Sequence, residues 1–236
     1  LYEILDLIAY YFPECEGINM DATVTSILHK SQEELEMLAR KKVKHLYLGI
    51  ESGLDDVLKF MKKDHDLAQA YQAIDRLHEA GLIYDAHIMT GVAGKGRGME
   101  NAEALAQFLN RTNPAHVVNF SMFLHKEVPL YQDIRQGTFV PADELETIRE
   151  EYHLIERIAP EKAGANILYD GFHDFIHVRV RGHLPGDKEK MLAKLNGIVQ
   201  EYEGKEPVYS FVQGECPNLE YCDDGKAVWD MDRKTS

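Results

Sequence analysis

The chain has 236 residues, 44% of them hydrophobic, and its 26 basic and 40 acidic residues give a net charge of −14. This length allows one large domain or a domain with an appendage, and this charge argues against a broad nucleic-acid-binding face. No stretch approaches the ~20 apolar residues of a membrane span, and three cysteines are too few for a disulfide framework, so we expect a reducing, cytoplasmic setting and no membrane partner.

Helix and strand patterns alternate along the first 160 residues. Apolar residues spaced three and four apart predict helices, and Ser31 with Glu34 forms a capping box at the start of one of them. Helices are expected over residues 1–12, 31–39, 54–61, 67–77, 101–109 and 141–155. Strands are expected over residues 17–25, 46–51, 82–89 and 115–124. The chain opens on Leu1 without the basic region of a signal peptide, and we expect a longer natural chain upstream of it.

The stretch Leu46–Gly53, which reads LYLGIESG, joins an apolar run to a polar, glycine-containing end. Its apolar run predicts a strand buried on both faces, and Gly49 leaves room for a close approach of a backbone or a ligand. Glu51 ends the strand, which is the functional end in a β/α barrel. A solvated glutamate at an ordinary strand end would give the same pattern.

Repeated strand–helix alternation indicates an α/β fold with a parallel sheet. The strands are too few for a closed eight-stranded barrel, so we predict a partial TIM-type (β/α) barrel, truncated at its N-terminus, over residues 1–160. From residue 161 the pattern changes to short strands at 166–169 and 175–180 and a helix at 187–202. We interpret residues 161–236 as a small α+β C-terminal appendage.

Four blocks in this order resemble the radical S-adenosylmethionine (radical SAM) superfamily, over roughly residues 17–158. The blocks are GIESG with VLKFMKK at 49–63, AGL at 80–82, MTGVAG at 89–94, and VPLY at 128–131 followed by Gly137 and Phe139. The resemblance implies a (β/α)6 barrel that holds a [4Fe–4S] cluster and S-adenosylmethionine. The cluster of that family reduces the sulfonium to give methionine and a 5′-deoxyadenosyl radical, which abstracts hydrogen from a substrate.

The resemblance also implies which residues contact the cofactor. Glu51, with Ser52 beside it, matches the polar strand end near the ribose or amino acid part, where a carboxylate accepts charge-assisted hydrogen bonds. Met89 and Gly91 match positions beside the adenine. On the sixth strand of the family pattern, Asn119 and Ser121 share a face by alternation. We expect them to line the barrel interior, with Asn119 in contact with the cofactor, and ordinary hydrogen bonding in the core is the alternative. His125 at the strand exit is a candidate for substrate contact.

The sequence departs from the family pattern in three ways. Ala93 stands where proline is usual and Lys95 where glutamate is usual. No CxxxCxxC cluster loop occurs in the chain, so its ligands are expected upstream of Leu1 and this chain by itself is expected to be inactive. The complete protein would be an Fe–S oxidoreductase or transferase-type enzyme of unknown substrate, reduced by a reductase or flavodoxin-type donor. Exposed barrel edges predict self-association.

Other constellations suggest alternatives. A metal-dependent barrel hydrolase would need ligands at several strand ends, where His87 and His125 are the candidates, and a binding or scaffold module without a cluster is a further possibility.

A zinc site from His173, His177, Cys216 and Cys222 has an unfavourable spacing. The glycine-rich loop 91–98 offers amides to a phosphate. The set Arg179, Arg181 and His183 forms a basic spot, for which a solvated edge strand is the simpler interpretation.

Overall fold

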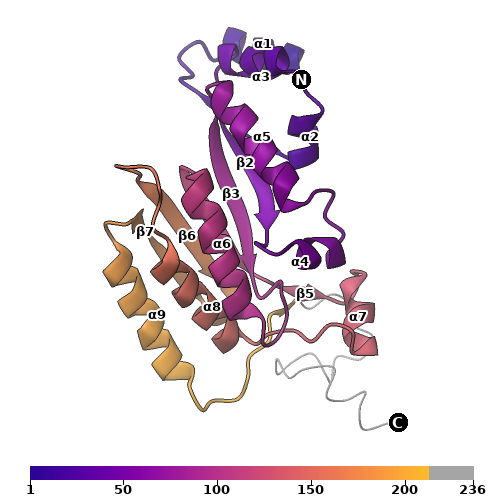
Figure 1. The fold of residues 1–236 in the computed structure, drawn as a ribbon, viewed down its shortest axis with the longest axis vertical. Helices are drawn as coiled ribbons and strands as arrows, with labels where there is room; N and C mark the ends of the chain where they lie inside the picture. Colours follow the sequence, from indigo (N-terminus) through magenta and orange to yellow (C-terminus); the bar gives the residue numbers. More distant parts are fainter. Residues whose placement is uncertain (213–236) are drawn as a thin grey trace.

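The computed structural model describes residues 1–212 (Figure 1). Its α-helices are α1 Tyr2–Tyr11, α2 Val24–Leu28, α3 Gln32–Arg40, α4 Asp55–Phe60, α5 Leu67–Glu79, α6 Gly98–Thr112, α7 Leu130–Gln136, α8 Glu144–Arg157 and α9 Lys188–Tyr202, with a 3₁₀ turn, η1, at Asp174–Ile176. Its strands are β1 Ile18–Ala22, β2 Val43–Glu51, β3 Ile83–Thr90, β4 His116–Ser121, β5 Leu124–His125, β6 Ile167–His173, β7 Val178–Leu184 and β8 Phe211–Val212.

The main sheet has six strands in the order β1-β2-β3-β4-β6-β7. Neighbours pair in parallel from β1 to β6, and β7 adds an antiparallel edge. The short strands β5 and β8 form a separate parallel pair. This open, mostly parallel sheet confirms the prediction of an α/β fold that makes up part of a barrel, with edges at β1 and β7.

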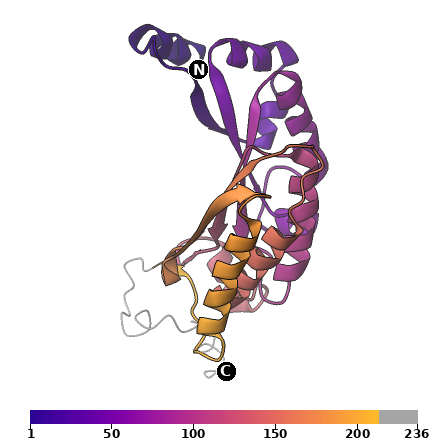
Figure 2. The same ribbon diagram turned by 90° about the vertical axis from the view of Figure 1, so that its left-hand side faces the viewer.

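Helices cover one face of the sheet. Figures 1 and 2 show α5, α6 and α8 stacked along the same side, and α9 packs beside α8 and β7. On β2, Leu46, Leu48 and Ile50 point into this helical layer and are at most 1% exposed. Tyr47 and Glu51 point the other way and are half-buried. The strand is therefore covered by helices on one face, and the prediction that both faces are buried is wrong; we call the other side the open face.

Local sequence signals set most of the element boundaries. The Ser31 hydroxyl accepts the Glu34 amide at 3.2 Å and Glu34 accepts the Ser31 amide at 2.7 Å, which confirms the capping box. The first strand ends before residue 25, because Thr23 caps the short helix α2. Pro141 lies before α8 rather than in its first turn, since Asp143 provides the cap.

The region beyond residue 160 continues the same sheet. β6 pairs with β4 in register, with Phe120 beside Phe172, and β7 follows β6 as a hairpin. The described part of the expected appendage 161–236 thus shares one sheet with residues 1–160 and differs in this from a separate α+β unit. No helix among the described residues has the length and apolar character that crossing a membrane requires.

Candidate functional site

The end of β2 holds the residue with the least usual backbone. Glu51 has φ +62°, in the left-handed region that favours glycine, and the pairing with β3 shifts its register between Gly49 and Glu51. The Glu51 carboxylate accepts a hydrogen bond from Lys63 at 3.3 Å, and both side chains are about a quarter exposed. Strained backbone of this kind is characteristic of functional sites.

The space beside Gly49 is filled by the same pair. A Cβ at Gly49 would lie 2.7 Å from Glu51 Oε1 and 3.3 Å from Lys63 Nζ. The glycine therefore lets the Glu51 side chain fold back along its own strand. Lys63 ends the VLKFMKK block, so the two halves of this motif meet in space at the carboxylate.

Ser52 is turned away from the open face. It is fully buried, and its hydroxyl donates to Asn101 Oδ1 at 2.6 Å and accepts the Leu54 amide at 3.1 Å. The neighbouring Gly53 amide donates to the same Asn101 oxygen at 3.2 Å. Ser52 thus shapes the turn after β2, and its placement does not support the expected cofactor contact.

The end of β3 places Met89 on the open face. Met89 is half-buried and lies beside Phe120 of β4 in register, while Ile88 pairs with Glu51. The Met89 thioether and the Glu51 carboxylate therefore border the same edge of the sheet on adjacent strands.

Gly91 follows β3 with φ +82°, and a Cβ there would lie 2.7 Å from Thr147 Cγ2 and 3.4 Å from Met122 Cβ. The position faces α8 rather than the open face. A side chain at residue 91 would therefore collide with Thr147 of α8.

The loop 91–98 uses its amides internally. Those that donate to oxygens of the protein belong to Gly91, Gly94, Lys95, Gly96 and Arg97. These five amides are already bonded within the protein, so they are not free to bind a phosphate.

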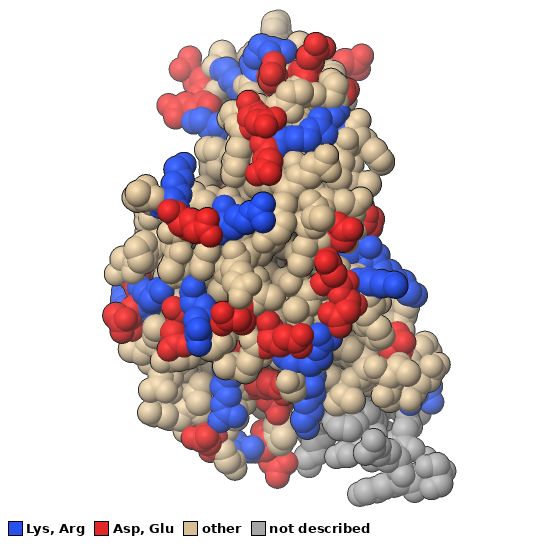
Figure 3. All heavy atoms as spheres, in the orientation of Figure 1, with Lys and Arg blue, Asp and Glu red and all other residues tan. Residues whose placement is uncertain are grey.

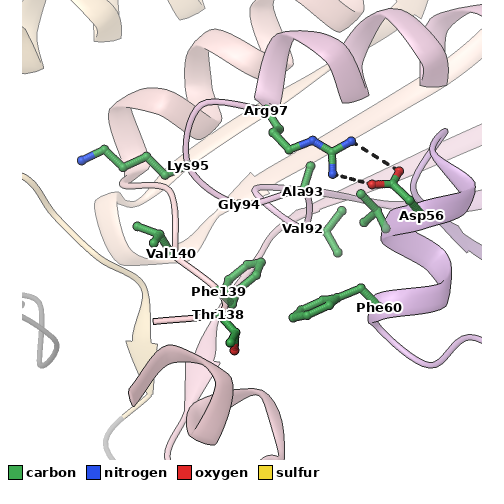
Figure 4. Close-up of a pocket in the computed structure, with 11 residues that line it drawn as sticks. Asp56, Phe60, Val92, Ala93, Gly94, Lys95, Arg97, Thr138, Phe139 and Val140 are labelled. Carbon is green, nitrogen blue, oxygen red and sulfur yellow. Dashed lines mark hydrogen bonds and ion pairs between the residues drawn. The ribbon is translucent and has the colours of Figure 1, made fainter. Parts of the chain in front are cut away.

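A cavity of about 350 Å³ lies between this loop, α4 and residues 138–140 (Figure 4). Arg97 reaches across to Asp56, with Nη1 2.7 Å from the carboxylate, and the rings of Phe60 and Phe139 stack at 5.8 Å. The ion pair fixes the loop against α4, and the ring stack fixes residues 138–140 against the same helix.

Asn119 and Ser121 do not lie on the open face. The Asn119 amide donates to Glu151 at 2.9 Å and its oxygen accepts the Thr90 amide at 3.2 Å, and Ser121 donates to Glu144 at 3.0 Å. Both side chains are at most 8% exposed and point at α8. The prediction that they line the barrel interior is wrong, because the alternation of β4 turns its odd-numbered residues towards the helices.

His173 completes this buried cluster. Its ring nitrogens lie 3.0 Å from Glu144 Oε2 and 3.0 Å from Glu151 Oε2, and all three residues are at most 2% exposed. Burial opposes a charge on the ring, but the Glu151 and Glu144 carboxylates outweigh it and raise the His173 pKa to about 10. An imidazolium ion held between two carboxylates is not a zinc ligand, so the zinc hypothesis fails at His173; Cys216 and Cys222 lie outside the described residues.

Glu150, the neighbour of Glu151 on α8, faces the two turns. It is 1% exposed, its Oε2 accepts the Gly91 amide at 2.8 Å, and its Oε1 accepts the Asn101 amide at 2.7 Å. Burial raises its pKa to about 8, against the effect of these two donors. Glu150 and Asn101 carry no motif signal in the sequence, and only the tertiary structure brings them to the turns.

An aromatic row crosses the open face. Ring centroids lie 5.1 Å apart for Tyr47 and His87, 5.9 Å for His87 and Phe120, and 5.8 Å for Phe120 and Phe172. The Arg179 guanidinium lies 4.7 Å from the Phe172 centroid. The row passes beside Met89 and offers flat apolar surface to a planar ligand.

The basic spot is partly neutralised. Arg179 and Arg181 both pair with Asp170, at 2.6 and 3.6 Å, and their side chains are more than half exposed on β7, the edge strand. This arrangement agrees with the solvated edge strand that we expected.

His125 lies in the small β5–β8 pair, where its Nδ1 accepts the Glu127 amide at 3.1 Å. His87 packs into the aromatic row. Among residues 1–212 no three His, Cys, Asp or Glu side chains are arranged to hold a metal ion. The hydrolase alternative is therefore not favoured by the strand-end residues on which it depended.

The described residues fit one of the two implied cofactors, S-adenosylmethionine, better than the other, the [4Fe–4S] cluster. A cluster needs three cysteine thiolates, whereas within the described range Cys15 is the one cysteine, and its thiol donates to the Gly17 carbonyl at 3.3 Å. The adenosine part of S-adenosylmethionine fits better, because the Glu51 carboxylate accepts from hydroxyls and Met89 with Phe120 provides apolar cover.

The chain is similar to several known proteins. The model of the radical SAM superfamily matches residues 1–109. A tRNA uridine(34) acetyltransferase of Methanocaldococcus infernus is 25% identical over 119 residues, which cover 50% of this chain and 22% of that protein. The structure of archaeal Methanocaldococcus infernus Elp3 with residues 1–46 deleted matches with a TM-score of 0.53 and 21% identity, covering 62% of this chain and 34% of that one.

This chain thus spans about a fifth of the curated relative and about a third of the solved one. The matched stretch includes Glu51, Lys63, Met89 and Gly91, and it ends inside α6. Over residues 1–109 the chain is therefore similar to the radical SAM superfamily.

Proposed function

We propose that this chain provides the adenosine side of the cofactor site in a radical SAM enzyme. The observation that carries the proposal is the Glu51 carboxylate, held at the end of β2 by a left-handed backbone and by Lys63, one strand away from Met89. A strained carboxylate beside an apolar row supplies both kinds of contact that a nucleoside needs.

Each residue has a distinct task in this proposal. Glu51 accepts hydrogen bonds from the ribose hydroxyls or the ammonium group, and Lys63 keeps its carboxylate in place. Met89 and Phe120 cover the adenine ring, since a thioether and an aromatic face pack well on a flat ring. His125, beyond the end of β4, remains our candidate for contact with the substrate.

When bound, S-adenosylmethionine and a reduced [4Fe–4S] cluster supply radical hydrogen abstraction. We propose that the cluster ligands come from outside these 236 residues, and that a reductase or flavodoxin-type partner supplies the electron. The residues of this chain bind and orient the nucleoside, and they exclude water from its apolar side. The acetyl transfer that the relative is named for is not included, because the match covers 22% of that protein.

Isothermal titration calorimetry with S-adenosylhomocysteine tests the proposal, because this ligand has the same nucleoside and the same amino and carboxyl groups as S-adenosylmethionine and lacks only the sulfonium methyl group. The chain should bind one molecule. Glu51→Ala should weaken binding by about ten- to a hundred-fold, because one charge-assisted hydrogen bond is lost. Glu51→Gln should lose less, since its amide oxygen still accepts.

Glu36→Ala is the matched control, because Glu36 is an exposed glutamate of α3 that pairs with Arg40. It should bind as the original chain does. Equal affinity of the Glu51→Ala and Glu36→Ala variants would show that our role for Glu51 is wrong. No binding to any of these chains would overturn the proposed function.

A further inference from the structure

A chain of buried hydrogen bonds joins the turn after β2 to the turn after β3. It runs from Gly53 and Ser52 to Asn101 of α6, from Asn101 to Glu150 of α8, and from Glu150 to Gly91. Its distances lie between 2.6 and 3.2 Å, and every side chain in it is at most 1% exposed. We call Asn101 and Glu150 the relay.

The relay has a fixed direction. Asn101 Oδ1 receives both donors of the first turn, so its amide nitrogen must point at Glu150. Glu150 then meets a donor at each oxygen, from Asn101 and from the Gly91 amide. Each group accepts on the side that faces a turn, so neither side chain can rotate without leaving a buried polar group unpaired.

The atoms around the relay are closely packed. A Cβ at Gly53 would run into the backbone of Ala104 and Leu105 in α6, and a Cβ at Gly98 would lie 3.0 Å from Glu150 Oε2. The first turn is pressed onto α6, and Glu150 is pressed onto the start of the same helix. A change at one end of the relay is therefore transmitted to the other.

We infer that Asn101 and Glu150 are positioning residues, which hold the two cofactor turns in the single arrangement that binds the nucleoside. Neither side chain reaches the open face, so they act through Ser52, Gly53 and Gly91. The relevance to cofactor binding rests on the proposed function, but the coupling of the two turns does not. Precise placement of first-contact groups by buried partners is a general requirement of binding sites.

A polarity exchange tests the relay. In Glu150→Gln the side-chain NH₂ group of the glutamine must face another donor, either the Asn101 side-chain NH₂ or the Gly91 backbone N–H. In Asn101→Asp the new carboxylate faces the Glu150 carboxylate. The double variant Glu150→Gln with Asn101→Asp restores every bond, because the glutamine nitrogen donates to the aspartate and its oxygen accepts the Gly91 amide. Glu156→Gln, at an exposed glutamate of α8, is the matched control.

The first readout is hydrogen exchange of the Gly53 amide, measured by NMR above pH 8, where the Glu150 carboxyl is ionised. Glu150→Gln should speed this exchange by about ten- to a hundred-fold although residue 150 does not touch Gly53, and the double variant should restore it. Unchanged exchange of Gly53 in Glu150→Gln would overturn the coupling, whether or not the chain binds a nucleoside.

The second readout is the affinity for S-adenosylhomocysteine in the same four variants. Each single relay variant should weaken binding by about tenfold or more, and the double variant should recover it. Coupling of the turns with unchanged affinity would overturn the positioning role while the proposed function stands. Absence of binding in the original chain would overturn the proposed function and the positioning role together, and leave the coupling to be decided by exchange.

Discussion

At the scale of single residues, Glu51 combines a functional carboxylate with an unfavourable backbone. A non-glycine residue in the left-handed region costs about 1–2 kcal/mol, and Glu51 adopts it at φ +62°. Glu51→Gly should therefore be more stable than Glu51→Ala by about 1 kcal/mol, although both variants lack the carboxylate. Urea unfolding of the two variants measures the difference. Equal stability would show that the backbone at residue 51 is not strained.

Gly91 and Gly96 offer a second comparison, because both have φ +82° but different surroundings. A Cβ at Gly91 meets Thr147, whereas nothing lies within 4 Å of one at Gly96. Gly96→Ala should cost about 1–2 kcal/mol for the backbone alone, and Gly91→Ala should cost about 1–3 kcal/mol more for the collision. Thermal unfolding of both variants tests this order, and a Gly96→Ala variant as unstable as Gly91→Ala would contradict it.

At the scale of elements, α8 is the centre of the buried polar network. His173, with a pKa of about 10, carries a proton that the unfolded chain releases near pH 6.5. The contribution of the His173 proton to the free energy of unfolding is therefore complete below about pH 6.5 and is lost as the pH rises towards about 10. Burial raises the pKa of Glu150 to about 8, so its ionisation also lowers the free energy of unfolding as the pH rises from about 4.5 to 8.

The free energy of unfolding should therefore fall steadily from about pH 6.5 to about pH 10. His173→Gln should flatten this dependence and lower stability near pH 7 by about 3–5 kcal/mol, because two buried carboxylates lose their cation. His183→Gln, at an exposed histidine of β7, should keep the original slope. Denaturant unfolding across this pH range is the measurement, and identical slopes in all three proteins would contradict the account.

The elements also show what a sequence can predict. The strand β2, the capping box at Ser31 and the motif turns follow from local patterns, and all three are found. The relay is different, because Asn101 lies 49 residues from Ser52 and Glu150 lies 59 residues from Gly91. Asparagine and glutamate on amphipathic helices have no local signature of such contacts, and only the packing of α6 on α8 creates them. The orientation of Asn119 likewise depends on which face of β4 is covered by α8, and the alternation of β4 by itself does not determine that face.

At the scale of the whole molecule, two kinds of surface favour self-association. The sheet ends in open edges at β1 and β7. The helix α1 exposes a broad apolar surface, with Ile4 59%, Tyr10 77% and Tyr11 68% exposed. By contrast, Figure 3 shows acidic and basic side chains interspersed over the described part of the face that carries the helices.

We therefore expect the chain to form dimers or larger species in sedimentation velocity as its concentration rises. Glu in place of Ile4 and Tyr11 should shift the distribution towards monomer, because charge opposes the burial of α1. Met37→Glu on α3, where the side chain is 38% exposed, should leave it unchanged. A monodisperse monomer of the original chain at all concentrations would contradict this expectation.

The most direct test of the nucleoside site is the NMR signal of the Met89 methyl group during titration with S-adenosylhomocysteine. The signal is identified with Met89→Leu. We predict a saturable shift of the Met89 methyl, while the methyl of Met191 of α9, buried in the core against β7, stays in place. Saturation of ligand without a shift at Met89, or a shift confined to methyl groups away from the open face, would contradict the assignment of this sheet edge as the cofactor site.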